Sequence, residues 1–80
     1  MLKKKLKLIV TFYTTSAAMA TEKACKENNI EGSLISAPRE LSADCGIAFA
    51  TDVNNKKEME KLLQDKKIEY EKLVEVEVWL

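Results

Sequence analysis

Two cysteines are the most nucleophilic side chains in this sequence, and they stand in different settings. Cys45 closes an irregular stretch that also holds the only proline and the only arginine of the chain, and it directly precedes Gly46. Cys25 lies twenty residues earlier, among residues that favour helix. This spacing matches neither a zinc-binding pattern nor a CxxC redox motif, so no metal site is expected. The chemistry that these residues could do is that of a nucleophilic thiolate.

Arg39 is the second residue of interest, because twelve of the thirteen basic residues are lysines. Its planar guanidinium can bind an anion or a carboxylate. Two interpretations stay open for it: Arg39 binds an anionic group near Cys45, or it forms a salt bridge with Glu40 or Asp44 that shapes the loop. Cys45 also has two interpretations, a reactive thiol or a small apolar side chain that closes the core beneath the loop.

The first half of the chain predicts a strand and then a helix. Residues 6–13 are rich in β-branched and aromatic side chains, which is typical of a strand. The apolar side chains that would share one face are Leu6, Leu8, Val10 and Phe12. A helix is predicted over residues 17–28. Its N-cap candidates are Thr14, Thr15 and Ser16.

The inward stripe of this helix contains Ala18, Thr21 and Cys25. Because a free cysteine in the middle of a helix usually packs like a small apolar residue, we expect Cys25 to be structural.

The second half predicts three more strands and one more helix. Short apolar runs over residues 33–36 and 46–51 indicate strands. In the latter, Ile47 and Phe49 share one face, and Ala48 and Ala50 the other. A helix capped by Asp52, Asn54 or Asn55 follows, with its apolar stripe formed by Met59, Leu62 and Leu63. The last strand is indicated by valines that alternate with glutamates over residues 74–79.

The order βαββαβ predicts one α+β domain over residues 1–80. It suits a ferredoxin-like sandwich, a four-stranded antiparallel sheet with both helices on one face. Right-handed crossovers would bring the loop between the second and third strands to the sheet end where the first helix begins. Cys45 would then lie near the helix amino end and the hydroxyl of Thr15. The partial positive charge of that helix end favours a thiolate.

The N-terminus also has the outline of a secretory leader. Basic residues over 1–7, an apolar run over 8–13 and Ala18-Met19-Ala20 fit that pattern. We favour a strand and a helix instead, because the apolar run is short and is followed at once by polar residues. No stretch approaches the roughly 20 apolar residues of a membrane span. A cytoplasmic location is therefore expected.

Composition excludes several classes of function. Thirteen basic residues balance thirteen acidic ones, so affinity for nucleic acid from bulk charge is not expected. The chain has no histidine, which excludes histidine catalysis and histidine metal ligands. An RNA-recognition domain has the same element order, but Phe49 has the parity of the core residue Ile47 and cannot serve as a stacking aromatic. A copper chaperone would need a CxxC loop, and an acylphosphatase would need an arginine after the first strand.

One run of residues carries a resemblance to a known family. The segments 9–12 and 18–23, and above all Pro38-Arg39-Glu40-Leu41-Ser42-Ala43-Asp44-Cys45-Gly46, resemble the selenium/sulfur carrier protein-like family of small bacterial domains. The resemblance covers residues 7–76. It implies that Cys45, the cysteine before the glycine, is the functional residue. A leucine-like core position of the family falls on Cys25, which implies a structural role there.

The chemistry implied is transfer of a chalcogen atom. Cys45 would hold sulfur as a persulfide, or selenium as a selenopersulfide, between donor and acceptor enzymes. Arg39 and the backbone at Gly46 would steady the terminal atom, with the hydroxyls of Ser42 and Thr15 as further ligands. Such a protein is a carrier without turnover of its own. It needs no cofactor and no membrane.

A different class of function stays open as the alternative. The sheet face without helices would be open and would carry Ile9, Thr11, Tyr13, Ala48, Ala50 and Trp79. A partly apolar face of this kind often marks a partner or homodimer interface. The protein would then be a regulatory or scaffolding module that needs no reactive thiol.

Overall fold

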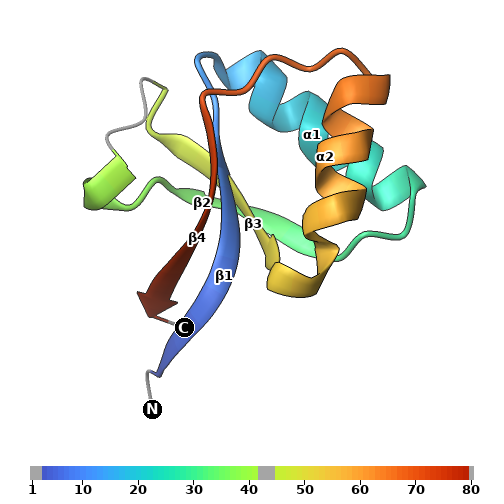
Figure 1. Cartoon of the computed structure of the whole chain (residues 1–80). Helices are drawn as coiled ribbons and strands as arrows, with labels where there is room; N and C mark the ends of the chain where they lie inside the picture. Colours follow the sequence, from blue (N-terminus) through green and yellow to red (C-terminus); the bar gives the residue numbers. More distant parts are fainter. Residues whose placement is uncertain (1–2, 42–44, 80) are drawn as a thin grey trace.

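The computed structural model describes residues 3–41 and 45–79, and of Trp79 the backbone alone. Six regular elements follow one another in the predicted order: β1 (Lys4–Thr11), α1 (Thr15–Glu27), β2 (Gly32–Ser36), β3 (Ile47–Asp52), α2 (Lys56–Asp65) and β4 (Lys72–Trp79). Two single 3₁₀ turns are added, η1 (Arg39–Leu41) after β2 and η2 (Val53–Asn55) before α2. The strands form one antiparallel sheet in the order β2-β3-β1-β4, and both helices lie on the same side of it (Figure 1). The predicted α+β architecture is confirmed.

β1 is a central strand, built from the segment that resembles a leader. It pairs with β3 from Lys7 to Thr11 and with β4 along its whole length. The strand begins two residues earlier than predicted, because β4 supplies a partner as far as Trp79, opposite Lys4. It also ends earlier than predicted, at Thr11, and Tyr13 beyond it is 52% exposed.

The main core lies between the sheet and the two helices. Its buried members come from β1, β3 and both helices: Leu8, Val10, Phe12, Ala18, Ala24, Cys25, Phe49, Met59, Leu62 and Leu63. Thr21, on the predicted stripe of α1, is fully buried as well. Leu6, which was expected to share a face with Leu8, Val10 and Phe12, is 50% exposed and does not belong to this core. It pairs with Glu77 where β1 has passed the end of its ladder with β3, so no neighbouring strand covers it.

A smaller core covers the opposite face of the sheet, which we had expected to be open. Its buried members are Ile9, Leu41, Ala48 and Ala50, and the three valines of β4 pack against it. Thr11 on this face is fully buried too. The expectation of an open face was wrong here, because η1 lies on this side of the sheet (Figure 1), and Leu41 of η1 and Ala37 before it pack on this smaller core. The side chain of Trp79 lies outside the described part of the chain.

α1 and η2 each begin at a side chain that accepts a backbone hydrogen bond, whereas Asn55, the N-cap of α2, makes no such bond. The Ala17 N–H donates to Thr14 Oγ1 at 3.2 Å, which makes Thr14 the N-cap and starts α1 two residues before the predicted position. Asp52 accepts from the Asn54 N–H at 2.8 Å and so caps η2, which leads into α2. The start of α1 is thus set at the sheet end where β1 finishes.

Candidate functional site

The connection between β2 and β3 passes from one face of the sheet to the other. We call residues 37–46 the strap. Its base is closed by the Ala37 N–H, which donates to the Gly46 carbonyl at 3.0 Å. On the face without helices, Ala37 and Leu41 pack on the smaller core. Cys45 packs on the main core, between the sheet and the helices. Of the described residues of the strap, Ala37 and Leu41 thus lie on one face of the sheet, and Cys45 lies on the other.

Strand register places this site at the amino end of α1. Ala48 of β3 pairs with Thr11, the last residue of β1. Cys45 and Gly46 precede Ala48, so they lie beyond the end of β1, where the chain turns into α1. Figure 1 shows the start of β3 and the start of α1 at the same end of the sheet. Thr15 is the exposed first residue of that helix. This is the juxtaposition that the element order predicts.

Cys45 is a half-buried thiol, followed in the chain by an exposed glycine. Its S–H donates to the Ile47 carbonyl, with Sγ and O 3.3 Å apart. This hydrogen bond requires the sulfur to keep its proton, so a thiolate or persulfide at Cys45 has to turn away from the carbonyl. Gly46 has φ +74°, a left-handed conformation that favours glycine, and a Cβ built on it would meet nothing within 4 Å.

Cys25 is buried as predicted and is chemically different. It is 1% exposed in the interior of α1, and its S–H donates to Met59 Sδ of α2 at 3.5 Å. Burial raises the pKa of the Cys25 thiol from its ordinary value of 9.0 to about 11. Both cysteines are free thiols. Attack on an external sulfur by Cys25 is therefore disfavoured both by access and by its protonated state.

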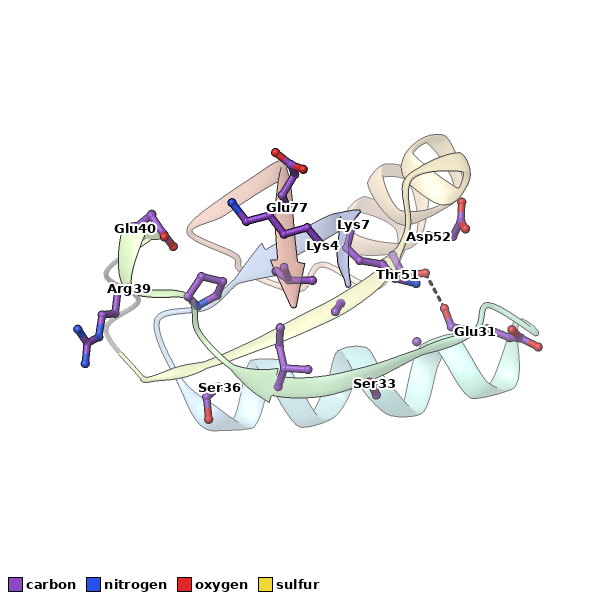
Figure 2. A pocket seen from close by; sticks show the side chains of 15 residues that line it. Lys4, Lys7, Glu31, Ser33, Ser36, Arg39, Glu40, Thr51, Asp52 and Glu77 are labelled. Carbon is purple, nitrogen blue, oxygen red and sulfur yellow. Dashed lines mark hydrogen bonds between the residues drawn. The ribbon is translucent and has the colours of Figure 1, made fainter. Parts of the chain in front are cut away.

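The other predicted site residues are distributed around the strap. Arg39 is exposed on η1, and in Figure 2 its guanidinium points away from the groove that η1 borders. Cys45, by contrast, packs toward the helix side of the sheet. Ser42 lies outside the described residues. The structure thus brings Thr15, Cys45 and Gly46 to one end of the sheet, with Arg39 on the other limb of the strap.

Sequence reasoning missed the residue that ties the strap to the sheet. Lys72, the first residue of β4, donates from Nζ to the Leu41 carbonyl at 2.8 Å. Next to it, the Glu71 N–H donates to the Thr11 carbonyl at 2.7 Å. A lysine among twelve lysines carries no signal of such a bond. Leu41, the one large aliphatic side chain of residues 37–46, was a usable signal that the strap packs on the sheet.

A groove of about 670 Å³ lies on the face without helices. Figure 2 shows it between β2 with η1 on one side and the strands β1 and β4 on the other. Apolar side chains form part of its lining: Ile35, Pro38, Ala50 and Val78. Lysines and acidic residues alternate around them, Lys4 and Lys7 with Asp52 and Glu77. The groove is the part of the helix-free sheet face that η1 does not cover.

Two further observations limit the classes of site. Over residues 3–41 and 45–79, the acidic and cysteine side chains form no group of three that could hold a metal ion. Among the same residues, every helix is too short or too polar to cross a bilayer.

Comparison with known proteins identifies the family. The profile of the family described as "Putative Se/S carrier protein-like" matches residues 7–75. No curated protein and no solved structure matches the chain. The matched range contains residues 7–11 of β1, both helices, the whole strap with Cys45, and the first residues of β4. The chain therefore belongs to the family of Se/S carrier-like proteins.

Proposed function

We propose that this protein carries a sulfur or selenium atom on Cys45 and passes it between partner enzymes. The observation that carries the proposal is the free, half-buried Cys45 thiol, next to the exposed Gly46, in a chain of this family. The second thiol, Cys25, is buried and has a raised pKa, so it does not compete. The cargo is the substrate, and the protein has no turnover of its own.

Loading is a thiol–persulfide exchange that balances without any redox partner. The Cys45 thiolate attacks the terminal sulfur of a persulfide on a donor enzyme. A new S–S bond forms at Cys45, the S–S bond of the donor breaks, and the donor cysteine leaves as a thiolate. Delivery repeats the step with an acceptor thiolate as the attacking group, which releases the Cys45 thiolate. Selenium follows the same route as a selenopersulfide, with S–Se bonds in place of S–S bonds.

The surroundings of Cys45 support an anionic terminal atom. The amino end of α1, which begins at Thr15, carries a partial positive charge and backbone N–H groups. Gly46, the next residue in the chain, has no side chain, and a Cβ built on it would meet nothing within 4 Å. Arg39 adds a positive charge on the outer limb of the strap, where solvent screens it. The hydroxyl of Ser42 is a further ligand in the proposal.

The test is intact-mass spectrometry after incubation with a cysteine desulfurase and cysteine. Wild type and Cys25→Ala should each gain one reducible sulfur atom, and Cys45→Ser should gain none. Circular dichroism should show that all three are folded. Uptake by Cys45→Ser at the wild-type rate would overturn the proposal. Iodoacetamide alkylation of Cys45 over a pH series is independent of the donor, and a Cys45 that stays unreactive throughout would also overturn it.

A second candidate is an interaction module that uses the groove. The observation favouring it is the groove of about 670 Å³ with apolar side chains in its wall and alternating charges around them. Its occupant would be an extended segment of a partner protein that presents apolar side chains between charges of both signs. This function needs no thiol. It predicts that Ala50→Lys abolishes partner capture and that Cys45→Ser leaves partner capture intact. The carrier function instead predicts that Cys45→Ser is the variant that loses function.

A further inference from the structure

We propose that the outer edge of β4 binds an extended segment of a partner protein in which apolar side chains alternate with lysine or arginine. β4 is the last strand in the sheet order, so β1 pairs with one of its edges and no other strand of the described chain pairs with it. About half of the backbone N–H and C=O groups of such a strand point outward. An extended peptide can pair with them and so add a strand to the sheet.

β4 is a long and regular edge strand. It pairs with β1 at every position from Lys72 to Trp79, so its register runs without a break, and it contains no proline. Prolines, bulges and short length are features that commonly block edge strands against pairing. β2, the strand at the other edge, spans only Gly32–Ser36 and has no charged side chain. β4 therefore offers the longer ladder and the charged groups for recognition.

The side chains of β4 form two rows of different chemistry. Val74, Val76 and Val78 pack on the smaller core, and each keeps part of its surface accessible. Glu75 and Glu77 alternate with the valines and are exposed. The side chains of an added strand would lie in turn beside the valine row and beside the glutamate row. Apolar side chains would extend the first row, and basic side chains would pair with the second.

The same pattern opposes pairing between two copies of β4. Strands related by a twofold axis in this way run antiparallel, and residues directly opposite each other share a face of the sheet. Whenever two or more valines of one copy lie opposite valines of the other, at least one glutamate lies opposite a glutamate. In the register centred on Val76, for example, Glu75 of each copy faces Glu77 of the other. Because like charges directly opposite destabilise a strand pair, the edge favours a basic strand over a second copy.

This edge differs from the groove on the face without helices. Glu77 and Val78 border the groove, whereas Glu75 and Val76 do not. A segment bound in the groove would therefore be insensitive to the charge at Glu75, and a strand added to β4 would depend on it. The inference also goes beyond the carrier function, because strand addition needs no thiol.

The test is an NMR titration with a short peptide in which valine alternates with lysine. Exchange of amide protons with deuterium should slow at alternate residues of β4, since those N–H groups would bond to the added strand. Glu75→Lys should weaken binding of this peptide by about fivefold or more. With Glu77→Lys added, the preference should reverse toward a peptide in which valine alternates with glutamate.

The control is Glu27→Lys with Glu60→Lys, which changes the net charge equally at exposed positions of the two helices and should bind like wild type. The inference fails if wild type does not bind the valine–lysine peptide at about 1 mM. It also fails if the control loses as much affinity as Glu75→Lys, or if the amides of β4 exchange as before. A wild-type dimer joined through β4, found by sedimentation and cross-linking, would overturn it too.

The outcome is separable from that of the proposed function. Cys45→Ser should bind the valine–lysine peptide like wild type. Failure of sulfur uptake would therefore count against the carrier function and leave the β4 edge as inferred, whereas loss of peptide binding in Cys45→Ser would contradict the inference.

Discussion

The same thiol group occurs in two regions of this molecule, and the difference between them is one of position. Cys25 lies in the interior of α1, faces α2 and has a pKa raised by burial to about 11. Cys45 lies in the connection between β2 and β3, half-buried and followed by an exposed glycine. The comparison teaches that regular structure makes a cysteine inert, whereas an irregular connection can leave one available for reaction.

The largest expected effect is a difference in alkylation rate between the two thiols. At pH 8, a thiol with a pKa of about 11 is ionised in only about one molecule in a thousand. Because Cys25 is also 1% exposed, iodoacetamide should modify Cys45 at least about a hundredfold faster. Peptide mass spectrometry measures both rates. In concentrated urea the rates should converge, and rates within about tenfold of each other in the native protein would remove the distinction.

Substitution of the two glycines should lower the free energy of unfolding by different amounts, because Gly32 contacts Phe49 of the main core and Gly46 lies next to Cys45 in the chain. A Cβ on Gly32 would lie 2.5 Å from the Phe49 ring and 2.7 Å from the Ala50 carbonyl oxygen. Gly32→Ala should therefore destabilise by about 2–3 kcal/mol through overpacking. Gly46→Ala meets open space and should cost about 1 kcal/mol, from its positive φ. Urea denaturation gives both values, and the comparison breaks if Gly46→Ala is the more damaging change.

Stability at high pH should depend on Cys25. The folded pKa of Cys25 is about 11 and lies above the unfolded value of 9.0. Between these values the unfolded chain loses the proton and the folded chain keeps it, so stability falls as pH rises from 9 toward 11. Urea midpoints measured across this range should fall less steeply for Cys25→Ala than for wild type. Equal slopes would mean that burial does not hold the proton on Cys25.

The smallest effect is expected at Arg39. Its side chain is exposed on the outer limb of the strap, whereas Cys45 packs on the other side of the sheet. Arg39→Met should therefore lower sulfur uptake by less than about twofold, because solvent screens a charge in that position. Initial rates of loading measure this. A tenfold loss would instead make Arg39 a direct ligand of the transferred atom.

Element order and core stripes could be predicted from sequence because they depend on local periodicity. Periodic patterns indicate which side chains face inward. They are the alternation through Leu8 and Val10 in β1 and the stripe of Ala18, Thr21 and Cys25 in α1. Periodicity does not show where a partner strand extends. Lys4 and Lys5 join β1 because β4 is long enough to pair with them, and no property of the lysines themselves indicates this.

The site could be predicted in part. Strand connections place the Cys45 loop at the amino end of α1, which follows from topology alone. The wrap of the strap over the sheet depends on Leu41 reaching Ile9 and Ala48, and the Lys72 bond joins residues far apart in sequence. Such contacts come from tertiary packing and leave no local pattern. The face expected to be open was misjudged for that reason.

The central claim is that Cys45 carries the chalcogen, and peptide mapping of loaded wild-type protein tests it most directly. Trypsin cleaves after lysine and arginine, so the two cysteines fall in separate peptides, residues 24–26 and 40–56. The protein is loaded with a desulfurase and cysteine, its persulfides are blocked by alkylation, and the peptides are weighed. The account predicts one additional sulfur atom in the peptide with Cys45, removed by reductant, and none in the peptide with Cys25. Additional sulfur on Cys25, or equal amounts on both, would contradict it.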